Sequence, residues 1–257
     1  MILTSLVDEY SERHDWRHTF AEAERQTLLG SVKSPGLLRR WLELEILYQQ
    51  ETGHAPALLE HVLNEDITID IDGTKHVIPV TTRIDRIDVA QSVSGVSFIV
   101  GDYKPRASSG YTTDAVFSGL LSQMPLYIAA TSRWLTRHDV PYEPLAAMYR
   151  SFGTAIYDTD DPRNQMVLYA PELKAWKSLA SVSISQRLKK YEDILERPLE
   201  EQVNLALGNV VGLAGSIKAG DFPVEPVKGA CGHCRMKELC RIDQWGQVEK
   251  PEQESIA

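Results

Sequence analysis

The stretch that decides the fold is RIDRID at residues 83–88, followed by VSFIVGDYK at residues 96–104. The second segment is an almost continuous apolar run that ends in charged residues, which predicts a central strand buried on both faces. Side chains alternate along a strand, so Asp102 and Lys104 share one face. If the two segments form neighbouring strands, Asp85 lies beside Asp102 on that face.

Two carboxylates that converge from adjacent strands repel each other unless a cation lies between them. A hard divalent ion such as Mg²⁺ relieves the repulsion, since it takes oxygen ligands. Lys104 on the same face would orient an activated water or stabilise the charge on an attacked phosphate. The set matches metal-assisted hydrolysis of a phosphodiester. The alternative, a solvated strand face on which Asp85 forms ordinary surface ion pairs with Arg83 or Arg86, stays open.

The rest of the chain predicts an α+β fold with a mixed sheet. Helices are expected over residues 1–29, from 37 to near 53, over 115–136 with a kink at Pro125, over 172–197 and over 199–218. Strands are expected over residues 67–71, from 76 to 89 with an interruption at Pro79, and over 96–103, 145–152 and 165–169. We expect an N-terminal helical segment (1–36), a core with C-terminal helices (37–218) and a cysteine-containing tail (219–257) whose end is disordered.

The order RIDRID, GDYK and then QMPLY at residues 123–127 resembles the PD-(D/E)xK nuclease superfamily. Within it, the likeness is greatest to the RecB/AddB-type nuclease domain at the C-terminus of bacterial helicase–nucleases. The resemblance implies a restriction-endonuclease-like core, with a central mixed β-sheet flanked by helices, and a Mg²⁺ or Mn²⁺ cofactor.

The resemblance also implies roles for individual residues. Asp85 and Asp102 would be metal ligands, with the main-chain carbonyl of Tyr103 as a third. Lys104 would be the catalytic lysine. The two residues that would shape the site and contact the DNA strand are Gln123 and Tyr127.

Other positions near the motif match the family less well. Thr82 stands where the family has a glycine, and strand alternation puts Asp88 on the face opposite Asp85. Glu60, expected at a helix end just before the first strand, matches a glutamate that family members often carry. It is a candidate for the metal shell, and plain solvation is the alternative. Glu43 and Glu45, on the preceding helix, are expected to face solvent.

Cys231, Cys234 and Cys240 form a C-x2-C-x5-C cluster. Three thiols this close in a cytoplasmic chain are typical of a metal centre. The spacing resembles the last three cysteines of the iron–sulfur staple in AddB-type domains, which implies a [4Fe–4S] cluster. Since the chain has no fourth cysteine, a fragment or a divergent relative is expected. Zn²⁺ with His233 as a fourth ligand, or three incidental thiols, are the alternatives.

Composition bounds the function. The 257 residues are 43% hydrophobic with a net charge of −9, which excludes a disordered chain. No run is long and apolar enough for a membrane span, and the acidic N-terminus lacks a secretory signal, so the cytoplasm is the expected location. The negative charge counts against this chain capturing DNA by itself. A helicase subunit or an upstream domain would therefore deliver the strand.

Two functions are consistent with these features of the sequence. The first is a metal-dependent DNA nuclease, an exonuclease on single strands, acting in DNA repair or recombination. The second is a non-catalytic module of nuclease fold that binds DNA or docks a helicase partner. The intact set of Asp85, Asp102 and Lys104 favours the first, and the missing fourth cysteine favours the second.

Overall fold

A computed structural model describes most of the chain. The described residues are 2–13, 21–31, 33–71, 73–105, 110–152, 163–184, 189–221, 234–235 and 239. They divide into two compact units, Met1–Val211 and Gly212–Ala257, and the sheet and the candidate site belong to the first. None of the helices in the described part is long and apolar enough to cross a membrane.

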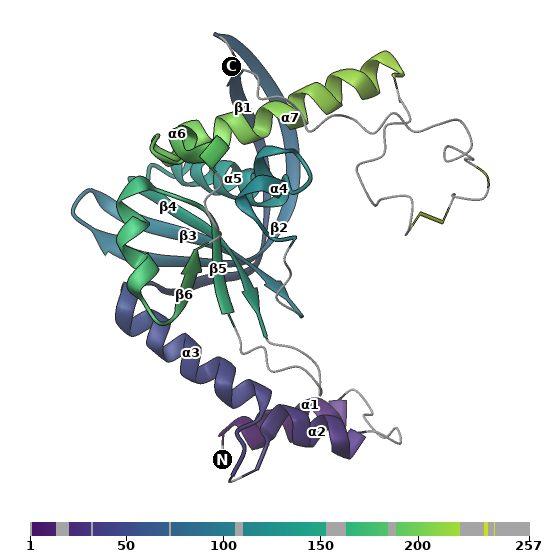
Figure 1. Cartoon of the computed structure of the whole chain (residues 1–257), viewed down its shortest axis with the longest axis vertical. Coiled ribbons are helices and arrows are strands. Elements are labelled where there is room, and N and C mark those ends of the chain that lie inside the picture. The colour runs from purple at the N-terminus through teal and green to yellow at the C-terminus, as the bar shows by residue number, and fades with distance from the viewer. Residues whose placement is uncertain are drawn as a thin grey trace. The chain divides into compact units, whose positions relative to one another are not determined.

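A six-stranded mixed sheet forms the centre of the first unit, with its strands in sequence order from β1 to β6 (Figure 1). The β1–β2, β2–β3 and β4–β5 pairs are antiparallel, and the β3–β4 and β5–β6 pairs are parallel. The strands are β1 (Ala55–Ile71), β2 (Thr74–Ser92), β3 (Gly95–Lys104), β4 (Tyr142–Ser151), β5 (Arg163–Tyr169) and β6 (Val182–Ile184). The expected α+β class is confirmed.

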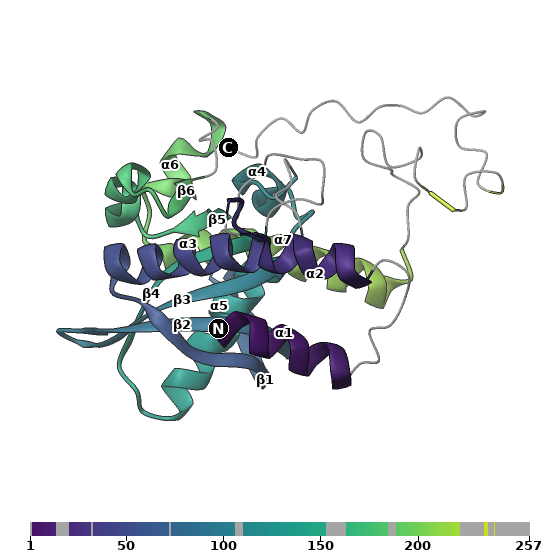
Figure 2. The same cartoon turned by 90° about the horizontal axis from the view of Figure 1, so that it is seen from below.

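Helices cover both faces of this sheet. The connection between the parallel strands β3 and β4 contains α4 (Thr113–Phe117) and α5 (Gln123–Arg137), and α5 packs on the sheet. The helix α3 (Leu37–Thr52) lies on the opposite face (Figures 1 and 2). The other elements are α1 (Ile2–Arg13), α2 (Ala21–Leu29), the 3₁₀ helices η1 (Pro171–Ser178) and η2 (Lys189–Tyr191), α6 (Glu192–Leu195) and α7 (Leu199–Ala219).

The core lies between the central strands and the helices. From Ser97 to Asp102, β3 is buried, as expected for a strand covered on both faces, and β4 is buried alongside it. The residues without solvent exposure in these two strands are Phe98, Ile99, Val100, Ala146, Ala147 and Met148.

The first hairpin is longer than predicted. Strand β1 begins at Ala55 rather than at residue 67, because β2 pairs with it over nearly its whole length. Pro79 does not interrupt β2. Strand β3 pairs only with the end of β2, from Arg86 to Ser92, so β2 has an open edge at Pro79, where a missing N–H is tolerated.

The predicted kink at Pro125 is wrong. The expected helix is two helices, and Pro125 is the third residue of α5. A first-turn N–H has no partner within its helix, so proline costs nothing there. The chain breaks before α5, near Gly119, whose φ is +79°.

The predicted helix over 172–197 is also wrong, since this region forms η1, β6, η2 and α6. The reason is a tertiary contact. The Glu51 carboxylate, at the end of α3, accepts hydrogen bonds from the backbone N–H groups of Ala180 (3.1 Å) and Ser181 (2.9 Å). These bonds hold the segment extended beside β5. The predicted helix over 1–29 consists of α1 and α2, and the residues between them lie outside the described part.

Candidate active site

Asp102 is the centre of a polar cluster on the α5 face of the sheet. Its side chain is buried, at 4% exposed, and its Oδ1 accepts a hydrogen bond of 2.7 Å from Gln123 Nε2. Its Oδ2 forms an ion pair with Lys104. That oxygen is buried and has no well-formed hydrogen bond among the described residues, so it retains capacity for a cation.

Lys104 lies two residues further along β3 on the same face, as alternation predicts. Its side chain remains 23% exposed. The ammonium lies 5.4 Å from the centre of the Tyr149 ring and 5.8 Å from that of Tyr111. The two rings stack on each other at 4.4 Å. Lys104 therefore has an aromatic wall on one side and Asp102 on the other, and its side chain is partly accessible to solvent.

Gln123 and Tyr127 enter the cluster from the first turns of α5. Their spacing of four residues places both on one helix face. Gln123 Nε2 lies 2.6 Å from the Tyr127 hydroxyl, which donates a hydrogen bond of 3.0 Å to the carbonyl of Arg83 on β2. Gln123 therefore connects Asp102 to Tyr127, and Tyr127 fixes the helix against β2.

Asp85 lies at an irregular point of β2. The β1–β2 ladder pairs Leu59 with Arg86 and His61 with Ile84, while Glu60 between them has a φ of +49°. A non-glycine residue in this region is strained, and such strain is found most often at functional sites. The Asp85 carboxylate turns to β3, where its Oδ2 accepts a hydrogen bond of 2.9 Å from the Tyr103 backbone N–H.

Side chains exchange faces at this irregularity. Arg86 contacts Glu45 of α3, whereas His61 packs edge-on against Trp134 of α5, with ring centres 5.5 Å apart. In a regular ladder these neighbouring pairs would share a face. The irregularity at Glu60 and Asp85 thus lets the part of the β1–β2 hairpin nearer its turn pack on α5, while Arg86 reaches α3.

The electrostatics of the cluster favour a bound cation. Burial raises the pKa of the Asp102 carboxyl, Lys104 and Gln123 oppose the rise, and the neighbouring Asp85 carboxylate adds to it. The pKa therefore lies above its usual range. Burial also raises the pKa of Tyr127, so its hydroxyl stays protonated. A divalent cation would favour the ionised form of Asp102 and relieve its repulsion with Asp85.

Glu60 lies elsewhere than expected. It belongs to β1 and not to a helix end, because β1 extends back to Ala55. Its side chain is 59% exposed and forms an ion pair of 3.1 Å with Arg83 Nε. Among the described residues, no group of three or more histidine, cysteine, aspartate or glutamate side chains is placed to hold a metal ion. The carboxylate part of the candidate site is thus the pair Asp85 and Asp102.

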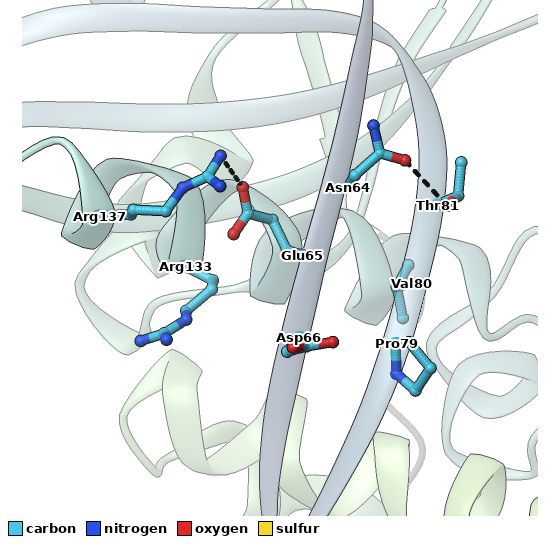
Figure 3. A pocket seen from close by; sticks show the side chains of 8 residues that line it. All are labelled: Asn64, Glu65, Asp66, Pro79, Val80, Thr81, Arg133 and Arg137. Carbon is cyan, nitrogen blue, oxygen red and sulfur yellow. Dashed lines mark hydrogen bonds and ion pairs between the residues drawn. The ribbon is translucent and has the colours of Figure 1, made fainter.

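The arginines of α5 line a separate cavity. Its volume is about 290 Å³, and it lies between the β1–β2 ribbon and the C-terminal half of α5 (Figure 3). Arg137 points to the buried Glu65 and pairs with it at 2.7 Å, while Arg133 is exposed. The cavity is lined by Asn64, Glu65, Asp66, Pro79, Val80, Thr81, Arg133 and Arg137.

Behind the candidate site, on the α3 face, lies a buried network of four charged residues, which we call the ion-pair network: Glu45, Arg86, Asp88 and Arg150. Arg86 donates to Asp88 Oδ1 at 2.5 Å and to Glu45 Oε2 at 2.9 Å. Arg150 pairs with Asp88 and with Glu45. The two arginines and Asp88 are 1% exposed. The network has no net charge, and it joins α3, β2 and β4.

The network corrects the prediction for Glu45, which is buried rather than facing solvent. Burial alone would raise the pKa of Glu45. The hydrogen bond from Arg86 and the charges of both arginines outweigh it, so the pKa is lowered. Asp88 lies apart from Asp85, since its carboxylate meets Arg86 and Arg150 instead. The signal for this network was an arginine inside each of two buried strands, since a buried charge requires a partner.

Gly101 is required where Arg150 crosses β3. A Cβ at Gly101 would lie 3.0 Å from Arg150 Nε and 3.3 Å from its Cδ. Because the network holds that guanidinium in place, Gly101→Ala is expected to lower the free energy of unfolding by about 1–3 kcal/mol. Urea denaturation at constant m-value measures the loss. Gly208→Ala in α7 is the matched control, since its Cβ would meet only Ile71 Cδ1, at 3.9 Å. It should gain roughly 0.5–1 kcal/mol, and equal stability of the two variants would contradict the packing argument.

The cysteine cluster is outside most of what the structure describes. Cys231, Cys240 and His233 lie outside the described residues, and Cys234 is exposed. The iron–sulfur and zinc hypotheses stay predictions.

The chain belongs to the PD-(D/E)XK nuclease superfamily, because the family model of that superfamily matches residues 3–241. Members of the superfamily are nucleases, which hydrolyse phosphodiester bonds and typically use Mg²⁺ or Mn²⁺. A search of curated proteins found no match. The family and the central mixed sheet agree with the fold expected from residues 83–104.

Proposed function

We propose that this chain is a Mg²⁺- or Mn²⁺-dependent deoxyribonuclease whose reaction centre is the cluster around Asp102. The observation that carries the proposal is the buried Asp102 carboxylate, which meets Lys104 through Oδ2 and Gln123 through Oδ1. Asp85 lies close enough to raise the pKa of Asp102. Folding alone gives no reason to bury one carboxylate beside another, because the repulsion is unfavourable without a cation.

The residues divide the work by position. Asp85 and Asp102 would hold the metal through their carboxylates, with the Tyr103 carbonyl as a third oxygen. When bound, the metal would supply a Lewis acid and an activated water. The Tyr103 amide orients Asp85, and Gln123 orients Asp102. Lys104, the partly exposed cation of the cluster, would donate to a phosphate oxygen and stabilise the negative charge that develops there.

We further propose single-stranded DNA as the substrate, exonucleolytic cleavage, and a role in DNA repair or recombination in the cytoplasm. A partner of RecB/AddB type, a helicase subunit or an upstream domain, would deliver the strand. The net charge of −9 supports delivery, because long-range attraction to DNA is weak for an acidic chain. The partial exposure of the Lys104 side chain supports the proposal, because a DNA strand in solvent could contact Lys104 directly.

Lys104→Ala is expected to lower the rate of Mg²⁺-dependent cleavage by about 100-fold, the usual cost of removing a group that stabilises developing charge. Cleavage of end-labelled single-stranded DNA measures the rate, and the two labelled ends distinguish exonuclease from endonuclease. Lys174→Ala is the matched control, since Lys174 on η1 pairs with Glu196, the residue that follows α6. It should cleave as the parent does. Equal rates for the Lys104→Ala variant and the parent would exclude the proposed role.

The rival is a non-catalytic module of nuclease fold that binds DNA or docks a helicase. One observation favours it: the described residues contain no group of three or more histidine, cysteine, aspartate or glutamate side chains that could hold a metal ion. Calorimetric titration of the parent with Mn²⁺ separates the two. Absence of binding, together with absence of cleavage, would support the rival.

A further inference from the structure

Tyr103 is held at two points by β2. Its backbone N–H, which lies in the plane of the sheet and points to β2, donates to Asp85 Oδ2 at 2.9 Å. On the α3 face its hydroxyl accepts a hydrogen bond of 3.3 Å from Arg86 Nη1. Since Arg86 follows Asp85 in β2, two consecutive residues of β2 hold Tyr103, Asp85 at its amide and Arg86 at its hydroxyl.

The Tyr103 ring is further confined by aromatic neighbours. It stacks on Phe152 at 5.4 Å between centres and meets Trp41 of α3 edge-on at 6.4 Å. Phe152 and Trp41 also contact each other, at 5.6 Å. Because Phe152 and Trp41 confine the ring, the Tyr103 hydroxyl has little freedom to move. The hydrogen bond from Arg86 therefore constrains the whole residue.

Arg86 is itself fixed by the ion-pair network. Its guanidinium bonds to Glu45 on α3 and to Asp88 on β2, and the same nitrogen that meets Glu45 Oε2 also reaches Tyr103. The guanidinium is planar and binds these partners as a fork, which lysine cannot reproduce. A buried network of this kind contributes little net stability relative to apolar packing. Its use here is better explained by the position that it imposes.

We propose that Arg86 is a positioning residue for Asp85, acting through Tyr103 from the far face of the sheet. Arg86 fixes the Tyr103 side chain, and the Tyr103 amide fixes the Asp85 carboxylate beside Asp102. The proposal rests on the proposed function only for the statement that Asp85 holds a metal. The positioning of Asp85 by Tyr103 is independent of it.

Two variants test the proposal. Arg86→Lys keeps the charge and loses the fork, and Tyr103→Phe removes only the hydroxyl acceptor and leaves no buried charge unpaired. Both should weaken Mn²⁺ binding, measured by calorimetry, by about 10- to 100-fold, as for groups that orient metal ligands. Both should also speed hydrogen exchange of the Tyr103 amide at least roughly tenfold relative to that of Val100, because the bond to Asp85 loosens.

Asn164→Ala is the control for a purely structural effect. Asn164 accepts from Arg150 Nη1 at 3.1 Å, is buried, and contacts the network at the end away from Tyr103. It should lower stability while leaving Mn²⁺ affinity and Tyr103 exchange as in the parent. If Arg86→Lys does not fold, Tyr103→Phe decides.

The outcomes separate the two proposals. A parent that binds no Mn²⁺ refutes the proposed function, and Tyr103 exchange alone then decides the positioning role. Unchanged exchange in the folded variants overturns the positioning role, whether or not the parent binds metal. Equal losses of Mn²⁺ affinity in the Asn164→Ala and Tyr103→Phe variants would also overturn it, because the effect would then follow stability and not position.

Discussion

Asp102→Asn is expected to abolish metal-dependent cleavage without lowering the stability of the metal-free protein. Asparagine keeps the shape and an oxygen for the Gln123 hydrogen bond, but it removes the charge that would bind the cation. Losing a ligand of a catalytic metal costs several kcal/mol of transition-state stabilisation, so the rate should fall by roughly 1000-fold or more. Single-turnover cleavage of labelled DNA measures the loss.

The stability of the same variant depends on pH with a defined sign. The pKa of Asp102 is raised in the fold, mainly by burial. A raised carboxyl pKa means that the fold favours the neutral form. The parent's stability is therefore full below the unfolded pKa and declines as pH rises through the folded one. The thermal midpoint of Asp102→Asn should thus exceed that of the metal-free parent at neutral pH, and the gap should close on acidification.

Asp66→Asn is the control for this experiment. Asp66 is an exposed aspartate on β1, outside the cluster. It should change neither cleavage nor the pH dependence of the thermal midpoint. A variant at Asp102 that cleaved as the parent does would refute the assignment of the reaction centre. A midpoint lower than that of the parent at neutral pH would refute the electrostatic argument alone.

Asp88→Asn is expected to destabilise the fold by about 3–5 kcal/mol, the usual cost of breaking a buried ion pair on one side. Asp88 accepts from both buried arginines, so losing its charge leaves the network with a net positive charge and no access to water. Urea denaturation with an unchanged m-value measures the loss. Asp66→Asn should stay within about 0.5 kcal/mol of the parent, as is usual for surface changes.

A paired replacement tests whether the cost comes from the unpaired charge. Asp88→Leu combined with Arg150→Met removes one charge of each sign and leaves the Glu45–Arg86 pair. The double variant should be more stable than Asp88→Leu alone. If the double variant loses as much stability as the Asp88→Leu and Arg150→Met single variants lose together, the shape of the side chains and not the charge balance governs the site.

The residues of the candidate cluster were predictable because local rules bring them together. Alternation along β3 places Asp102 and Lys104 on one face, and a spacing of four in α5 does the same for Gln123 and Tyr127. The pairing of β2 with β3, which begins at Arg86, then brings the Asp85 carboxylate to the Tyr103 amide. Each step needs only the periodicity of an element and the adjacency of two strands.

The ion-pair network was not predictable in this way. Glu45 bonds to Arg150, 105 residues away in sequence, and no period in α3 marks it as buried. The same limit explains residues 172–197, where Glu51 of α3 captures the backbone amides of Ala180 and Ser181. In both cases a partner distant in sequence decides the local structure, and a single sequence does not name that partner.

The break in the ladder at Glu60 and Asp85 divides the β1–β2 ribbon into two halves whose side chains alternate between the faces in opposite phase. Beyond His61 the ribbon is ordinary two-residue alternation closed by a turn. It can be lengthened or shortened there by two residues in each strand without changing which side chains face α5. Insertion or deletion of one residue on either side of Glu60 would instead move the side chains of one half to the opposite face of the sheet. The proposed metal-binding aspartate thus occupies a point where the number of residues in the strand is constrained. A design that transfers this hairpin to another protein has to keep that number.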